Sequence, residues 1–218
     1  RPNAAFAEIA KSYVSVRVTD MRAVDLNVFR FDYDLTLAML LMNADGTVYH
    51  RYGGRDHTGA ESWMSMTSLQ RLMRETLEDH VAYSKNPAPP LSRPKRTIMD
   101  IAPFARKVAK QKVDCVHCHM VTEAEREHLQ EEKRWSRDDI WLWPEPSRLG
   151  VTLDAEDQAL VAEVRKDSPA EKAGIKAQDR FLRLGTQRIR SITDIQWVLE
   201  TAPVGATELA AEFTRGVD

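Results

Sequence analysis

Several features are scarce in this sequence, and each shortage excludes a class of protein. Only two cysteines occur, Cys115 and Cys118, so a disulfide-dense scaffold is excluded and any thiol chemistry is confined to one place. The formal net charge is −2, from 31 basic and 33 acidic residues, which gives no strong overall field for nucleic acid. No apolar run approaches the roughly 18 residues that a membrane-spanning helix needs. With 9 glycines, 10 prolines and 29% charged residues in 218, global disorder is not expected.

Motifs of several enzyme classes are also missing. The sequence has no glycine-rich phosphate loop, no Gly-x-Ser-x-Gly nucleophile elbow and no His-Glu-x-x-His zinc motif. We therefore assign no catalytic residue from the sequence. Because the sequence starts at Arg1 rather than at Met, we expect that a leader or an upstream segment has been removed.

Changes in composition divide the chain into residues 1–85, 86–146 and 147–218, which predicts an α+β multidomain protein. Residues 1–85 predict a small mixed α/β unit. Its expected elements are a helix over residues 3–13, a strand over 14–18 from period-two alternation, a buried strand over 37–42, a hairpin strand over 47–52 and a helix over 67–83. Thr67 and Gln70 form a capping box for the last helix. His50 and His57 flank the exit of the hairpin and are expected at the surface.

This order of elements resembles the later part of a thioredoxin-like domain. The resemblance rests on residues 39–54, where an Asn-Ala-Asp-Gly turn joins two strands and Arg-Tyr-Gly-Gly follows. Two departures matter, because the redox Cys-x-x-Cys of that family would precede the first helix, and Asp34-Leu35-Thr36 replaces its proline. We expect a non-catalytic scaffold here. The alternative is a thiol oxidoreductase whose main motif lies upstream of Arg1.

Residues 86–146 combine a linker with charged helical sequence. Four prolines within residues 86–94 predict a stiff, extended linker. Residues 86–112 then carry seven basic residues and one acid, whereas residues 122–139 carry seven acids and four basic residues. The simplest expectation is that two solvated helix faces attract each other. The alternative is a docking patch for a redox protein partner.

The sequence Cys115-Val116-His117-Cys118-His119 carries the most specific chemistry. On a helix, residues three positions apart point the same way, so Cys115 and Cys118 can bond one edge of a flat macrocycle. That pattern is typical of a c-type haem site, with two thioethers and a proximal histidine. An apolar stripe predicts a helix running into Cys115, and residues 101–121 resemble the start of a class I cytochrome c. The resemblance implies covalent haem c on Cys115 and Cys118, with His119 as the axial iron ligand.

A second axial ligand has two candidates. His80 lies on the apolar stripe of the predicted helix 67–83, where a structural core histidine is the alternative. His128 lies on a helix that the Thr122/Glu125 capping box opens, and it could fold back over the site. Candidate walls for the haem are Trp135, Trp141 and Trp143.

Other interpretations of the same motif stay open. Cys115 and Cys118 with one or two of His117, His119 and His128 could form a zinc or copper site. A redox dithiol is less favoured, because the motif does not obviously lie at a helix N-terminus that would lower a thiol pKa. Inert thiols are the remaining alternative.

Residues 147–218 predict a separate domain. The stretch Ser-Pro-Ala-Glu-Lys-Ala-Gly-Ile at residues 168–175, followed by Gln-Asp-Arg-Phe-Leu at 178–182, is similar to the signature of bacterial PDZ domains. The resemblance implies a β-barrel with two helices that binds the C-terminus of a protein or peptide between a carboxylate-binding loop and the helix at 193–201. It assigns the backbone donors to Leu149, Gly150 and Val151, and the apolar pocket to Ile195, Val198 and Leu199. A groove that is self-occupied or only structural is the alternative.

Together these parts predict an extracytoplasmic c-type haem protein, periplasmic or otherwise, for electron transfer or redox sensing. The PDZ-like domain would recruit a partner, since it offers no nucleophile or base. A non-redox adaptor with a zinc or copper site is the rival from another class.

Overall fold

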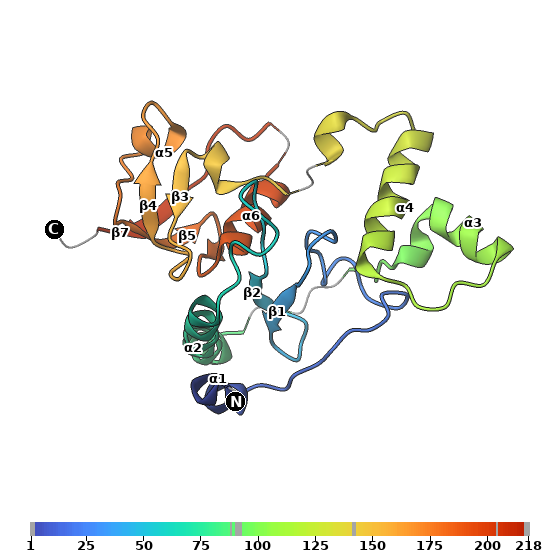
Figure 1. Cartoon of the computed structure of the whole chain (residues 1–218), viewed down its shortest axis with the longest axis horizontal. Coiled ribbons are helices and arrows are strands. Elements are labelled where there is room, and N and C mark those ends of the chain that lie inside the picture. The colour runs from blue at the N-terminus through green and yellow to red at the C-terminus, as the bar shows by residue number, and fades with distance from the viewer. Residues whose placement is uncertain (1–2, 88, 90–92, 141–142, 204, 216–218) are drawn as a thin grey trace. The chain divides into compact units, whose positions relative to one another are not determined.

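The computed structural model describes residues 3–87, 89, 93–140, 143–203 and 205–215 (Figure 1). The chain forms two compact units. The first comprises Arg1–Tyr13, Leu35–Ala88 and Trp143–Asp218, and the second comprises Val14–Asp34 and Pro89–Leu142. The chain therefore leaves the first unit and re-enters it twice, and residues 1–85 contribute to both units.

An α/β layer opens the first unit. It contains α1 (Ala4–Ala10), β1 (Met39–Met42), β2 (Val48–Tyr52) and α2 (Met66–Lys85). Both helices start at a side-chain cap, because Asn3 accepts from the amides of Ala5 and Phe6, and Ser65 accepts from the amide of Ser68. The predicted helix from Thr67 thus exists, but Ser65 caps it.

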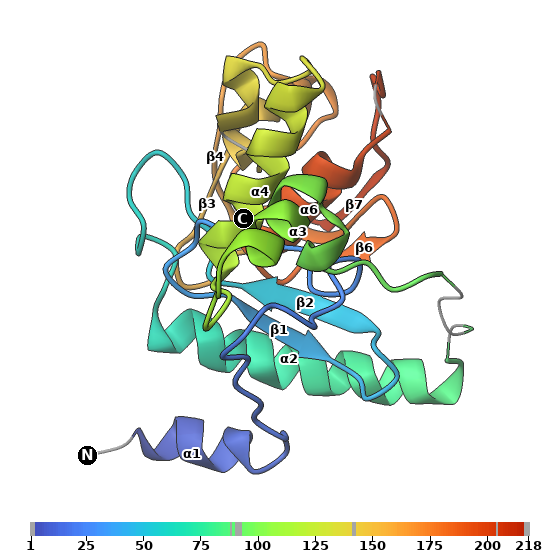
Figure 2. The ribbon, with the colours of Figure 1, turned by 90° about the vertical axis from the view of Figure 1, so that its right-hand side faces the viewer.

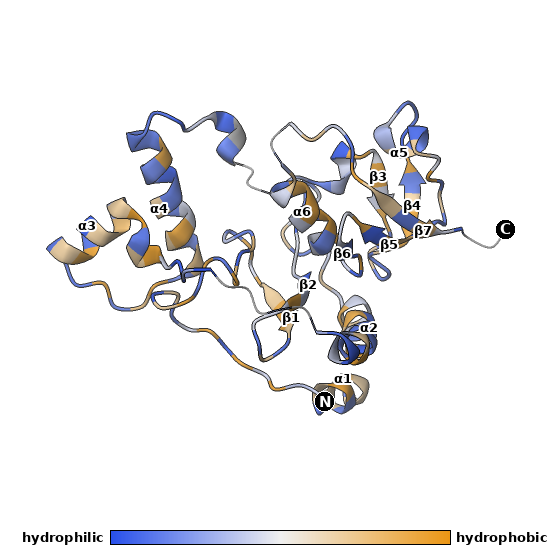
Figure 3. Ribbon diagram, turned by 180° about the vertical axis from the view of Figure 1, so that it is seen from behind, coloured by the Kyte–Doolittle hydropathy of each residue, from blue (hydrophilic) through white to orange (hydrophobic). Residues whose placement is uncertain are grey.

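The β1–β2 hairpin confirms the predicted acidic turn. Asp45 accepts a hydrogen bond from the Thr47 amide at 2.8 Å, and Gly46 takes a φ of +92°, which glycine adopts without strain. The hairpin lies over α2 (Figure 2), and β1 is hydrophobic along its length (Figure 3). A small apolar core forms between them, made of Leu41, Tyr52, Leu69, Leu72 and Met73.

The strand predicted over residues 14–18 is wrong. This stretch has no regular secondary structure, and the side chains of Val14 and Val16 are 91% and 79% exposed. Alternation makes a strand only where another strand offers hydrogen-bond partners. In the described ranges, the sheet of this layer holds β1 and β2 alone.

All regular secondary structure in the described part of the second unit is helical. It contains the 3-10 turn Ile98–Asp100, α3 (Ala102–Lys110), α4 (Cys118–Glu131) and the 3-10 turn Arg137–Ile140. Its core comprises Met21, Leu26, Tyr33, Ile98, Ile101, Phe104, Val116, Val121 and Ala124. Ion pairs join Arg96 to Glu125 and Arg106 to Glu131, which confirms that the two blocks of opposite charge attract each other.

The C-terminal part of the first unit holds the remaining elements. They are the 3-10 turn Pro146–Arg148, β3 (Val151–Leu153), β4 (Val161–Val164), α5 (Pro169–Lys172), β5 (Arg180–Leu184), β6 (Gln187–Arg188), α6 (Ile192–Thr201) and β7 (Ala211–Thr214). Two helices are present, as predicted. Instead of a closed barrel, the described strands form a β3–β4 pair and a β6-β5-β7 sheet, joined by a bridge between Leu160 and Arg180. The bridge joins the residue just before β4 to the first residue of β5, so these two strands do not pair along their length.

No helix in the described part of the chain is both long and apolar enough to cross a membrane.

Candidate functional site

The loop before β3 is shaped by one glycine. Gly150 has a φ of +86°, and a Cβ at this position would lie 2.1 Å from the Ser168 Cβ. Ser168 is buried because it caps α5, where its hydroxyl accepts from the Glu171 amide. The loop carbonyls are also fixed, since Leu149 accepts from the Ala170 amide and Gly150 from the Arg165 amide. Only glycine fits this close contact between loop and helix cap.

The predicted backbone donors of this loop are largely engaged within it. The Leu149 amide donates to the Pro146 carbonyl at 2.9 Å, and the Gly150 amide donates to the Ser147 carbonyl at 3.0 Å. Val151 begins β3 opposite Val164 of β4. A carboxylate at this loop would therefore have to compete with the 3-10 turn for two of the three amides.

A groove between β3 and α6 needs a free strand edge, and β3 provides one. Among the described strands, β3 pairs with β4 on one side only. Of the residues predicted to line the apolar pocket, Ile195 is 0% exposed and, like Val198, belongs to the domain core. Leu199 packs against this core while staying partly exposed. Thr193 and Gln196 of α6, which were not among the predicted pocket residues, lie against Gly54, and Gln196 also bonds the Arg55 carbonyl.

Comparison with known proteins identifies this part of the chain. Residues 147–209 match the PDZ domain family, so this segment is a PDZ domain. Neither the curated proteins nor the solved structures include a significant match. The PDZ domain implies an interaction with a protein or peptide partner.

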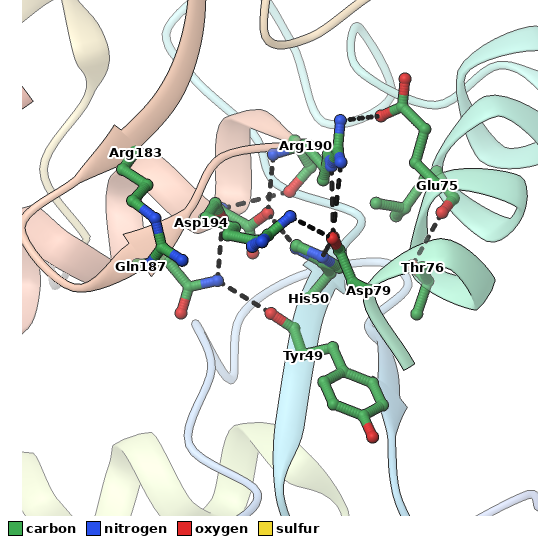
Figure 4. Close-up of polar contacts among 12 residues, drawn as sticks. Tyr49, His50, Glu75, Thr76, Asp79, Arg183, Gln187, Arg190 and Asp194 are labelled. Atoms are coloured by element: carbon green, nitrogen blue, oxygen red, sulfur yellow. Dashed lines mark hydrogen bonds and ion pairs between the residues drawn. The ribbon is translucent and has the colours of Figure 1, made fainter. Parts of the chain in front are cut away.

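A buried histidine joins the hairpin to this domain. The His50 side chain of β2 is 1% exposed, which corrects its predicted surface position. Its Nδ1 lies 2.8 Å from Oδ2 of Asp194 on α6, and its Nε2 lies 2.9 Å from Oδ2 of Asp79 on α2 (Figure 4). The Arg51 amide donates to Asp194 as well, at 3.1 Å. Three elements that are distant in sequence therefore meet at one imidazole.

The charges around His50 complement each other. Burial disfavours a charged ring, but the carboxylate and the hydrogen bond of Asp194, together with Asp79, outweigh it and raise the pKa of His50 to about 9. Burial opposes the ionised form of Asp79 too, but hydrogen bonds from His50 and Arg190 lower its pKa to about 2. Arg188 donates to Asp79 at 2.6 Å. At neutral pH the ring is therefore an imidazolium that donates from both nitrogens, which a neutral imidazole cannot do.

The Cys-x-x-Cys-His motif spans the start of a helix. The preceding helix α3 ends at Lys110, and α4 begins only at Cys118, so the predicted helix running into Cys115 is wrong. Cys115 lies in irregular chain and is exposed, and Cys118 is half-buried. Residues 111–117 have no regular helical structure and interrupt the helix that the apolar stripe predicted. The two thiols thus do not lie on one helix face, although the second lies at a helix N-terminus.

The histidines of the motif are partly oriented by their neighbours. Nδ1 of His119 lies 3.1 Å from a carboxylate oxygen of Glu123, one turn further along α4. The rings of His117 and His119 stack, with centroids 5.9 Å apart. Within the described residues, no group of three or more histidine, cysteine or acidic side chains is close enough together to hold a metal ion.

The two candidate second ligands are both hydrogen-bonded or paired. His80 belongs to the first unit, where its Nδ1 lies 2.8 Å from the Tyr49 hydroxyl. His128 lies nine residues after His119 on α4, which is about 13 Å along the axis and on the opposite face. It pairs with Glu132 at 3.4 Å. His128 would reach iron at His119 only if α4 unwound.

The candidate haem walls have different surroundings. Trp143 packs on Trp197 of α6, with ring centroids 5.9 Å apart. The Trp135 indole nitrogen is buried and has no hydrogen-bond partner among the described residues. Trp141 lies outside the described residues.

Proposed function

We propose that this protein is an adaptor that captures an extended peptide segment of a partner protein through its PDZ domain. The single observation that carries this proposal is the match of residues 147–209 to the PDZ family, combined with the unpaired edge of β3. PDZ domains bind by adding a peptide strand to such an edge, with pockets for alternate side chains. The α/β layer, as a thioredoxin-like scaffold without redox cysteines, would hold α6 in place through the contacts of His50 and Arg51 with Asp194.

A C-terminal carboxylate is the ligand group that the loop before β3 would hold. The amides of Leu149, Gly150 and Val151 would supply the donors once the 3-10 turn opens. Arg148 is exposed beside them and adds a positive charge. The side chain of Leu199, at the partly exposed edge of the core, would contact the last apolar residue of the peptide.

A displayed library of peptides with free C-termini tests this function. We expect the protein to enrich one apolar C-terminal pattern. Leu199→Glu should weaken binding of the enriched peptide at least about tenfold, because a charge would replace an apolar contact. Leu182→Glu, at an exposed position on β5, is the matched control and should bind normally. Enrichment of no pattern, or equal binding by both variants, would refute the proposal.

A second function, c-type haem attachment, is favoured by the contact between His119 and Glu123. A carboxylate that accepts from Nδ1 fixes the tautomer of a ligating histidine and leaves Nε2 for the metal. The two thiols are unbridged and Cys115 is exposed, so both are available for thioether bonds, and α4 would have to extend back to Cys115 to place them on one helix face. Cys115 and Cys118 would tether the group, and His119 would ligate its iron. Bound haem would supply one-electron transfer, and such attachment implies an extracytoplasmic location with a redox protein as partner.

Absorption of protein matured in an oxidising compartment that contains a haem-attachment system tests this second function. We expect a Soret band that survives acid-acetone extraction, and its loss in Cys115→Ser and Cys118→Ser. Glu123→Gln should retain covalent haem but shift the reduction potential, because the charge beside His119 is removed. Colourless protein with two thiols open to alkylation would rule haem out. Stoichiometric zinc or copper would instead support the metal-stabilised adaptor.

A further inference from the structure

Residues 54–63, which we call the groove strap, connect β2 to the segment before α2. The strap can be followed in Figure 1 as the teal loop beside α6. Its two ends are buried at Gly54 and Trp63, whereas its tip is exposed at His57, Thr58 and residues 60–62. It belongs to the same compact unit as the PDZ domain.

The strap covers the first half of α6. Gly54 lies so close to the helix that a Cβ would approach both Gln196 Oε1 and Thr193 Oγ1 to 2.5 Å. The Gln196 side chain donates to the Arg55 carbonyl at 2.8 Å. Every residue of Ile192–Gln196 is buried: Ile192 and Ile195 face the domain core, Asp194 faces His50, and the strap lies against Thr193 and Gln196.

Other contacts anchor the strap at both ends of β3. His57 contacts Glu145, which lies just before the carboxylate-binding loop, through its amide at 2.8 Å and through Nδ1 at 2.9 Å. At the other end, the Trp63 carbonyl accepts from Gln158, in the turn after β3, at 2.7 Å. Gln158 in turn accepts from the Ile192 amide at the start of α6. The strap therefore lies against the first half of α6 and is attached to residues just before and just after β3.

The fit of the strap is incomplete. The hydroxyl of Thr193 and the indole nitrogen of Trp63 are buried without a hydrogen-bond partner among the described residues. An unpaired buried polar group disfavours the state that contains it. A ligand that replaced residues 54–62 could bond the Thr193 hydroxyl, which the strap leaves unpaired.

We propose that the groove strap is an intramolecular ligand, which occupies the PDZ groove and must leave before a partner peptide binds. This inference rests on the proposed peptide-binding function and specifies how it is regulated. In the closed state the strap covers α6 while the 3-10 turn holds the amides of Leu149 and Gly150. In the open state both walls of the groove are free for an extended apolar peptide. Trp63 stays in the core, and Gly53, with a φ of +106°, marks the other end of the moving segment.

The release variant is Gly54→Leu. The added side chain would collide with Gln196 and Thr193, yet it changes no residue of the groove itself. Ala60→Leu, on the exposed tip of the same strap, is the matched control. The probe is a fluorescent synthetic peptide selected from the free-C-terminus library on the Gly54→Leu protein, and fluorescence anisotropy measures its dissociation constant.

We expect Gly54→Leu to bind this peptide at least about tenfold more tightly than wild type and Ala60→Leu do. The reason is that the apparent affinity decreases as the fraction of molecules with a closed groove increases. Hydrogen exchange of wild type adds a test without a variant, and residues 54–62 should lose protection when the peptide binds. If Gly54→Leu fails to fold, Glu145→Ala removes the contact with His57 and should give a smaller gain of about twofold to threefold.

Two results would overturn the self-ligand inference alone. These are equal affinities for release variant and wild type, or increased protection of the strap on binding. Failure of every variant to select a peptide would overturn both the peptide-binding function and the inference. Because the first two results require measurable binding, the two failures are distinguishable.

Discussion

Replacement of His50 by glutamine should remove a pH-dependent part of the stability of the first unit. The side chain is buried between two carboxylates, and its pKa rises from 6.5 to about 9. This difference of about 2.5 pKa units corresponds to about 3 kcal/mol of preferential binding of the proton by the folded state. Glutamine has a similar length but donates from a single nitrogen and carries no charge.

The sign of the pH dependence follows from the direction of the shift. A base whose pKa is higher in the folded than in the unfolded state stabilises the fold fully below its unfolded pKa, here 6.5. That contribution declines as the pH rises from 6.5 and is lost above about 9. Asp79 contributes at acidic pH, because its pKa is lower in the folded state than in the unfolded state. Its stabilising contribution is complete above pH 3.8 and is lost as the pH falls through about 2.

Urea unfolding of wild type and His50→Gln at pH 6 and at pH 9.5 measures this contribution. The difference in free energy of unfolding between the two proteins should shrink by about 3 kcal/mol between these pH values. Taking this difference cancels the titration of lysines and tyrosines that both proteins share. His57→Gln is the control, because His57 is exposed and solvent screens its pair with Glu145.

If the difference in free energy of unfolding between wild type and His50→Gln were the same at both pH values, the argument would be refuted. An NMR titration in which the ring nitrogens of His50 respond near pH 6.5 would refute it as well. Either result would mean that the imidazole is neutral at pH 7 and that one of its carboxylate contacts is absent in solution.

Two further substitutions test the local geometry. Gly150→Ala should destabilise the PDZ domain by about 2 kcal/mol or more, because the new side chain combines a positive φ with a collision with Ser168. Gly185→Ala meets open space and should cost about 1 kcal/mol from backbone strain alone. Thermal unfolding of the two variants measures the difference. Phe104→Ala should destabilise the second unit by about 3 kcal/mol, since Phe104 lies in its core. Hydrogen exchange should then speed up in α4 and stay unchanged in α6, and equal acceleration in both would contradict the division into two units.

Local signals in the sequence were sufficient for the parts of the fold that form through neighbouring residues. The acidic turn at Asp45 and Gly46 predicted the hairpin, and the Ser-Pro-Ala stretch by which the PDZ-like signature was recognised forms the cap of α5 at Ser168. Each of these interactions joins residues at most four positions apart. The same locality explains why the PDZ domain could be recognised from its signature alone.

The candidate site could be predicted only in part because its key contacts are distant in sequence. His50 lies 29 positions before Asp79 and 144 positions before Asp194 in the sequence. Within its own segment, each of the three resembles an ordinary surface residue. Only one signal was present, an ionisable residue at an inward-facing position of β2 among apolar neighbours. The strand at residues 14–18 failed for the converse reason, since its pattern was right but no described strand lies beside it.

The groove strap directly follows β2, whose residues His50 and Arg51 are fixed to α6 by hydrogen bonds to Asp194. This attachment affects how readily the strap can leave the groove. The strap begins only three residues after Arg51. Trp63 fixes its other end in the PDZ core. A segment held at both ends stays near its site at an effective concentration of order millimolar, so weak contacts such as that between Gln196 and Arg55 are enough to keep it seated. A partner peptide must therefore bind the open groove tightly enough to compete with that local concentration, which favours partners that are themselves held close by.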